Sequence, residues 1–163
     1  MAIYFPNSSI TQVGGKIYTP GRIVQTVSTL NTTALQTTSS SAVDYFTSNS
    51  ITMTNAANKL VIEWHVDVRT NDWGDSAWNL YLMDLIHVQS GTQLAYTGYE
   101  GEFTYNIKHT HRSAYHAPGS VGPHSYKLRG WSYIAGKNTS FNGTGGWVGN
   151  DNQSWIRITE IAA

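Results

Sequence analysis

The chain has 163 residues, ten basic and ten acidic side chains, and no cysteine. This length predicts a single domain, and the absence of cysteine excludes disulfides and thiolate metal sites. Balanced charge, with only 12% charged residues against about 25% in an average protein, argues against a nucleic-acid-binding domain. A net charge near zero does little to keep monomers apart, which indicates a protein that works within an assembly.

The beginning of the chain, residues 1–20, is predicted to form a short extended arm. Proline and glycine interrupt it, and it has no long periodic pattern of apolar residues. The start MAIYFPNSS lacks the basic and apolar segments of a secretory signal, and no stretch reaches the roughly 20 apolar residues of a membrane span. We therefore expect a protein that is made in a cytoplasm and not inserted in a membrane, with one domain at residues 21–163.

The remainder of the chain is typical of short strands separated by turns. Its Thr-rich, aromatic-rich composition favours strands over helices, and turn signals recur at the spacing of an all-β protein. We therefore predict an antiparallel β-sandwich or barrel. Residues 109–124 contain two prolines and two glycines without a consistent period, so they are predicted to be a connection. The predicted strands are 22–30, 43–46, 50–54, 59–69, 78–88, 94–100, 102–108, 125–135 and 154–162.

The clearest alternation in the chain is KLVIEWHVDVR, residues 59–69. Its apolar positions are predicted to fill the space between two sheets. The charged positions between them, among them Asp67, are expected to face water or an adjacent subunit. The alternative is that Trp64 lies on the subunit side while the charged row faces outward.

Four histidines, His109, His111, His116 and His124, fall within sixteen residues. Histidines at i and i+2 of a strand share a face, which is one way to build a metal site. However, residues 103–150 contain no Asp or Glu, and no zinc-binding spacing is present. A structural or interface role is therefore favoured, and no metal or other cofactor is predicted. If the chain trimerises, His109 or His111 could instead form a ring of axial ligands.

Carboxylates are too few to favour an enzyme. Asp72 and Asp75 are predicted to be solvated loop acids, and their loop lacks a calcium-binding pattern. Asp84 interrupts an apolar face, so we expect it to make a buried or inter-subunit hydrogen bond. The chain contains no nucleophile elbow, phosphate-binding loop or zinc-protease motif. A non-enzymatic protein is therefore predicted.

Aromatic residues on predicted loops could stack on sugar rings, as in lectins. Trp73, Trp78 and Trp147 are the candidates for such stacking. Packing in the core or between subunits is the favoured interpretation.

Three segments, in this order, resemble small β-sandwich modules of tailed-phage virion proteins. GRIVQTVSTLNTTALQTTSSSAVDY resembles their opening GKILQVV…T…TSSTSFVD, and SITMTNAANKLVIEWHVDVR resembles the SITPSSSSNKILV segment that follows. SYKLRGWSYIAG…SWIRITEIAA resembles their closing TYKVQ…SSITVMEIA. The similarity runs from about Gly21 to Ala163. This chain differs from the family pattern at residues 108–123 and has only a short arm before the sandwich.

The resemblance implies a jelly-roll-like domain, generally trimeric, on a virion surface. A free-standing module with a short arm suits a capsid decoration or knob protein that binds the major capsid protein. Four arm residues are then expected to anchor the shell: Tyr4, Phe5, Pro6 and Ile10. The alternative is a fibre-tip or carbohydrate-binding module that recognises host surface glycans.

Overall fold

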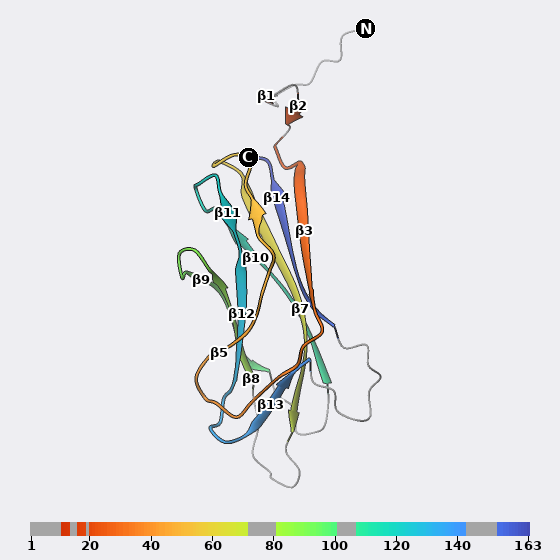
Figure 1. Cartoon of the computed structure of the whole chain (residues 1–163), viewed down its shortest axis with the longest axis vertical. Coiled ribbons are helices and arrows are strands. Elements are labelled where there is room, and N and C mark those ends of the chain that lie inside the picture. Colours follow the sequence, from red (N-terminus) through yellow and green to blue (C-terminus); the bar gives the residue numbers. More distant parts are fainter. Residues whose placement is uncertain (1–10, 14–15, 19, 72–80, 101–106, 143–152) are drawn as a thin grey trace.

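The computed structural model describes residues 11–13, 16–18, 20–71, 81–100, 107–142 and 153–163, and regular structure in this part is entirely β-strand (Figure 1). The all-β prediction is confirmed. This part of the chain contains no helix long and apolar enough to cross a membrane. The strands are β1 (Thr11–Val13), β2 (Lys16–Tyr18), β3 (Ile23–Asn31), β4 (Leu35–Thr37), β5 (Val43–Thr47), β6 (Ile51–Thr52), β7 (Lys59–Asn71), β8 (Tyr81–His87), β9 (Gln93–Glu100), β10 (Ile107–His116), β11 (Pro123–His124), β12 (Tyr126–Ser132), β13 (Asn138–Phe141) and β14 (Ser154–Ile161).

Eight of these strands form the two sheets of a jelly roll. One sheet has the order β3-β14-β7-β10 and the other β5-β12-β8-β9, with every neighbouring pair antiparallel. Taken in chain order, the first sheet contains the first, eighth, third and sixth strands, and the second sheet contains the second, seventh, fourth and fifth. This interleaving of distant strands is the double-sheet jelly-roll arrangement. The predicted antiparallel, jelly-roll-like sandwich is therefore confirmed.

The long strand β7 organises the first sheet. It pairs with β10 along one edge, from Leu60 to Arg69. Along its other edge it pairs first with β14, up to His65, and then with β13, from Val68 onward. Strand β4 pairs with β13 at this end of the sheet. Between the ends of β14 and β13, the Asn142 N–H donates a hydrogen bond to the carbonyl of Asp67 at 2.7 Å.

The core lies between the two sheets and includes the alternating apolar positions of β7. All five of these side chains are at most 2% exposed, as predicted for the inner face of the strand. The alternative that Trp64 lies on a subunit side is wrong, because Trp64 belongs to this core. The five positions are Leu60, Ile62, Trp64, Val66 and Val68, and the cluster includes Tyr81, Met83, Leu85, Tyr126, Leu128 and Phe141 from elsewhere.

The predicted connection at 109–124 is wrong in its first half. Residues 107–116 form β10, which pairs with β7 over ten residues. The inner positions of β10 include Thr110 and Ala114, which are buried but weakly hydrophobic. A strand whose buried face carries such residues has no strong apolar period, so sequence alone did not reveal it.

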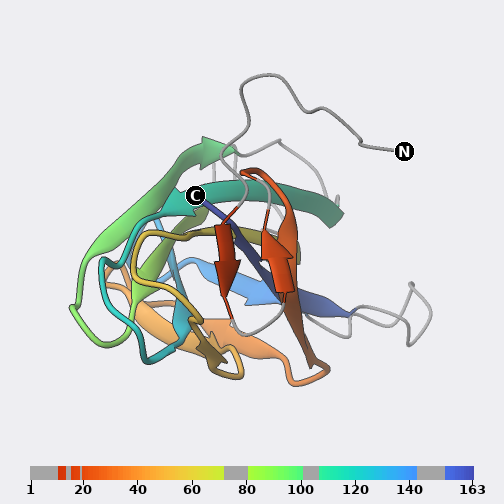
Figure 2. The same ribbon diagram turned by 90° about the horizontal axis from the view of Figure 1, so that it is seen from above.

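At the N-terminal end, β1 and β2 pair only with each other among the described strands. In Figure 1 this hairpin lies beyond the end of the sandwich at which β3 begins, and in the view from above in Figure 2 it lies in front of the sandwich. At this end, hydrogen bonds from the Gly21 N–H to the Ala162 carbonyl and from the Ala162 N–H to the Arg22 carbonyl extend the pairing of β3 with β14. The domain boundary between residues 20 and 21 stays a prediction.

Gly130 is required by the packing of β12 against the core. A Cβ atom at this position would lie 2.4 Å from Cζ of Phe141, a ring that is fully buried. The ladder between β12 and β5 shifts register just before it, between Leu128 and Arg129. The glycine therefore allows close packing next to an irregularity of the ladder.

Substituting Gly130→Ala should lower the free energy of unfolding by about 1–3 kcal/mol, because the added methyl overpacks the core against Phe141. Urea unfolding followed by tryptophan fluorescence would measure the loss. Phe141→Leu in the same chain should restore part of it by making room, so that the two substitutions are less than additive. A fully additive double variant would contradict this explanation.

Candidate functional site

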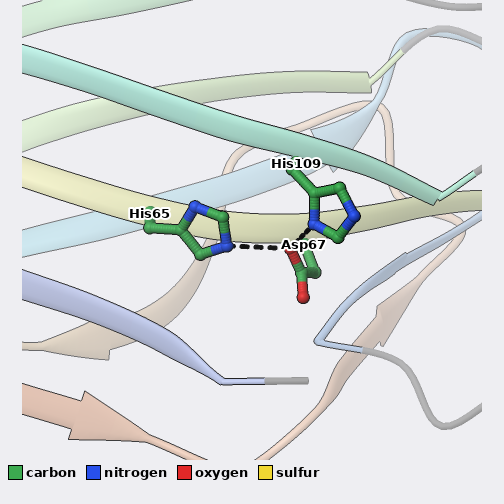
Figure 3. Close-up of side chains that lie close together, drawn as sticks. All are labelled: His65, Asp67 and His109. Carbon is green, nitrogen blue, oxygen red and sulfur yellow. Dashed lines mark hydrogen bonds and ion pairs between the residues drawn. The ribbon is translucent and has the colours of Figure 1, made fainter. Parts of the chain in front are cut away.

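The outer face of the first sheet carries a cluster of His65, Asp67 and His109 (Figure 3). Asp67 and His109 lie directly opposite each other on β7 and β10, and His65 precedes Asp67 by two residues on the same face of β7. The Nε2 atom of His65 lies 2.9 Å from Oδ1 of Asp67, and Nδ1 of His109 lies 2.6 Å from the same oxygen. Two imidazoles from neighbouring strands thus converge on one carboxylate oxygen.

Burial within this cluster increases towards Asp67. The exposed fraction of the side chain is 67% for His109, 24% for His65 and only 7% for Asp67. Asp67 was expected to face water or an adjacent subunit with the rest of the charged row. Its carboxylate does not face water, because the two histidines lie against it. A buried carboxylate is strongly unfavourable unless it is hydrogen-bonded, paired or bound to a metal. The two imidazole contacts provide this compensation.

Aromatic stacking holds the histidine rings in place. The ring of His65 stacks on that of His109, with centroids 5.9 Å apart, and on that of Trp155 of β14, with centroids 6.0 Å apart. His111 contacts Trp155 edge-on, with centroids 5.4 Å apart. Arg157 lies over the same indole, with its guanidinium carbon 5.6 Å from the ring centroid. Three strands of the sheet therefore contribute to one aromatic band.

His109 and His111 have the i, i+2 spacing considered above for a metal site. Although this segment was predicted to be a connection, they lie on one strand two positions apart. Only His109 belongs to the cluster, however, since His111 lies opposite His65 and contacts Trp155 instead. The carboxylate is that of Asp67, which lies 42 residues earlier in the chain than His109 and therefore outside the interval 103–150 that lacks Asp and Glu. The signal that could have found it is the alternation of 59–69, which already placed His65 and Asp67 on one face.

A second histidine cluster lies at the end of β8. His87, which sequence reasoning missed, is buried together with His124, and its Nε2 lies 3.1 Å from Nδ1 of His124. The ring of His116 packs edge-on against that of His87, with centroids 4.5 Å apart, and its Nδ1 lies 2.9 Å from the hydroxyl of Tyr126. Burial, and then the nearby His116 and His124, lower the pKa of His87 to about 4. Burial also lowers the pKa of His116. His87 and His116 are therefore neutral at pH 7.

Asp84 makes the buried interaction that was predicted for it. Its carboxylate is almost fully buried and pairs with the guanidinium of Arg129, whose Nε donates to Oδ1 at 2.9 Å while Nη2 donates to Oδ2. A bidentate pair of this kind compensates the buried charge. The interaction is structural and leaves Asp84 without a catalytic geometry.

Several predicted site residues lie outside the described part of the chain. They are the arm residues Tyr4, Phe5, Pro6 and Ile10, the tryptophans Trp73, Trp78 and Trp147, and the loop acids Asp72 and Asp75.

Exposed apolar side chains are present on the same outer face as the first histidine cluster. Leu30 of β3 lies opposite Trp155 in the β3–β14 ladder and is 56% exposed. Ile23 of β3 and Tyr115 of β10 are 62% and 75% exposed. These three side chains share one sheet face, and exposed apolar surface of this kind is available for binding another protein.

Comparison with known proteins gives a limited result. No protein-family model and no curated protein matches the chain. Structural similarity is found to the infectious bursal disease virus Gx strain (TM-score 0.47, 11% identity, 94% of this chain and 42% of that chain). It extends to the T13 viral particle (TM-score 0.46, 12% identity, 95% and 40%) and the VP2 subviral particle (TM-score 0.48, 13% identity, 95% and 42%) of the same virus.

The chain spans about two fifths of the length of those proteins. Identities and TM-scores this low assign neither a family nor a role to the chain. The resemblance of its segments to tailed-phage modules stays a prediction.

Proposed function

We propose that this chain is a non-enzymatic structural protein of a bacteriophage particle, a decoration or knob protein that binds the particle surface as a trimer. The jelly-roll strand order supports the proposal, since this fold recurs in viral capsid proteins. So does the resemblance of three sequence segments to tailed-phage virion modules. Fold alone does not define function, so the proposal depends on the surface.

The observation that carries the proposal is the outer face of the β3-β14-β7-β10 sheet. Leu30, Ile23 and Tyr115 expose apolar surface there, and Trp155 lies between β3 and β7 on the same face. Burying such surface between subunits is the main driving force of stable association. The arm residues would then fix the trimer to the shell by binding the major capsid protein; they are Tyr4, Phe5, Pro6 and Ile10. This binding would stabilise the shell by mass action.

The purified protein should have a mass in solution of three times the 18.0 kDa chain at micromolar concentration. Leu30→Asp should shift it towards the monomer, because a charge placed in an apolar interface loses its hydration without a partner. Light scattering coupled to gel filtration would measure both masses. Tyr96→Ser is the matched control, since Tyr96 is exposed on the opposite sheet and should leave the mass unchanged.

A monomer that also fails to bind purified phage particles would contradict the proposal. Density for the protein in an electron-microscopy map of the particle would locate it on the head, neck, fibre or knob. Loss of particle binding in a Tyr4→Ser, Phe5→Ser variant of unchanged mass would support the anchoring role of the arm.

A second candidate function is recognition of host surface glycans. The exposed ring of Tyr96 lies beside that of Trp131 on the outer face of the second sheet, with centroids 6.1 Å apart. Paired aromatic faces of this kind stack on sugar rings. Glycan-array binding that is lost in Tyr96→Ser would favour this function over simple decoration.

A further inference from the structure

We propose that His65, Asp67 and His109 bind a divalent transition-metal ion of the zinc class. Each residue offers one ligand atom, and the three atoms lie within 4.8 Å of one another. This proposal concerns a single chain and needs neither a trimer nor a phage particle, so its outcome is independent of the proposed function.

The donor atoms fit the coordination chemistry of such an ion. Zinc binds imidazole nitrogen and carboxylate oxygen at about 2.0–2.2 Å, so neighbouring ligands of a tetrahedral ion lie roughly 3.3–3.5 Å apart. The observed separations from Asp67 Oδ1 are 2.9 Å to His65 and 2.6 Å to His109. Small side-chain rotations are therefore enough to move these atoms apart, from their present contact distances to the spacing of metal ligands. Calcium and magnesium prefer oxygen ligands and fit this set poorly.

The backbone and the neighbouring rings hold the ligands in position. Asp67 and His109 are cross-strand partners in the β7–β10 ladder, and His65 shares their face of the sheet. The ring of His65 is sandwiched between those of His109 and Trp155. Ligands fixed on strands and held by packing lose little conformational entropy on binding, which favours affinity.

Both imidazoles contact the same oxygen of Asp67, Oδ1. Their two nitrogens therefore lie around one carboxylate atom, which is the arrangement that a shared metal ion requires. The ring of His109 is largely exposed, so its contact contributes little to folding by itself. An ion bound among the three groups would be accessible to solvent on the side of His109, the most exposed of the three side chains. Three protein ligands leave a fourth position for water or for a group from a binding partner.

Isothermal titration with Zn²⁺ alone, on the untagged full chain, tests the proposal. We expect a binding event that weakens about tenfold or more in His109→Ala and in Asp67→Asn, because each variant removes a ligand. His111→Ala is the matched control, since it removes an imidazole two residues away on the same strand and should change affinity by less than about twofold. Mg²⁺ in place of Zn²⁺ should give no binding.

Three results would overturn the assignment. The first is the absence of Zn²⁺ binding to the unmodified chain, and the second is unchanged binding in His109→Ala. The third is an equal loss in His111→Ala, which would place the site elsewhere on the strand. His109 is exposed, so its alanine variant should fold normally, and circular dichroism would verify this even if Asp67→Asn is destabilised.

Discussion

Replacing Glu160 by alanine should lower the free energy of unfolding by about 3–5 kcal/mol, the range for breaking a buried charged network. Glu160 of β14 is fully buried, and its carboxylate accepts four hydrogen bonds. Oε2 accepts from Nε2 of Gln25 at 2.6 Å. Oε1 accepts from the backbone N–H and the hydroxyl of Thr54 and from Nδ2 of Asn58. The alanine variant would remove the acceptor that these donors share and would leave the buried amide of Asn58 without its carboxylate partner.

The glutamate acts as a bridge between distant parts of the chain. It joins the C-terminal strand to β3 through Gln25 and to the loop between β6 and β7 through Thr54 and Asn58. Burial by itself raises the pKa of Glu160, but the hydrogen bonds from Asn58, Gln25 and Thr54 together outweigh it and lower the pKa. The group is therefore ionised at neutral pH, and its contribution to stability is lost only as the pH falls below the ordinary glutamate range.

Two further variants make this prediction specific. Glu160→Gln should also destabilise, because its amide would face the Nε2 group of Gln25, which is held by a second bond to the Thr52 carbonyl at 2.6 Å. Glu63→Ala is the matched control, since Glu63 forms only a solvent-accessible ion pair with Arg157 and should cost less than about 1 kcal/mol. Urea unfolding at pH 7 would measure all three. Equal losses for Glu160→Ala and Glu63→Ala would contradict the role of the network.

Acidification from pH 7.5 to 5 should destabilise the protein by about 2 kcal/mol through the buried histidines at the end of β8. The pKa of His87 is about 4 in the folded chain and about 6.5 when the chain is unfolded. Between pH 4 and 6.5 the unfolded chain therefore binds more protons at His87 than the folded chain does. The stabilising contribution of neutral His87 is complete above pH 6.5 and is lost progressively as the pH falls towards 4.

The hydrogen bonds explain why protonation is unfavourable here. The Ser120 carbonyl can only accept, so Nε2 of His124, 3.1 Å away, donates to it. In neutral His124 the Nδ1 lone pair then accepts from Nε2 of His87, and Nδ1 of His87 faces the Ser90 hydroxyl at 2.8 Å. Protonating His87 would place a positive charge in a buried site beside two further imidazoles, which is why its pKa is lowered. In the described part of the chain, the rings of His116 and Tyr126 also face His87, and neither supplies a negative charge at acidic pH.

Chemical unfolding at a series of pH values would measure this loss. His87→Gln should flatten the slope of stability against pH between 7.5 and 5, even if it lowers stability at pH 7.5. His111→Gln is the control, because His111 is exposed and lies outside the cluster, so the slope should persist. A His87→Gln variant with the slope of the unmodified chain would show that other groups determine the acid sensitivity.

Local patterns in the sequence were enough to predict the fold class and one sheet face. The alternation of residues 59–69 identified β7 and its inner side chains because the side-chain period of a strand is two, and this period survives in any tertiary context. The interruption of an apolar face by Asp84 indicated a buried polar interaction, although not that Arg129 would supply it. Strand β10 was missed because its buried positions are Thr110 and Ala114, which give no hydrophobic period.

The sequence by itself therefore determined that the chain is an all-β sandwich and which side chains of β7 are buried. Only the tertiary structure decided that Asp67 is buried rather than solvated, that His109 meets it from the neighbouring strand, and that His87 contacts His124. These pairs lie 42 and 37 residues apart. Antiparallel register between distant strands places them together, and that register results from the packing of the whole core rather than from any local pattern.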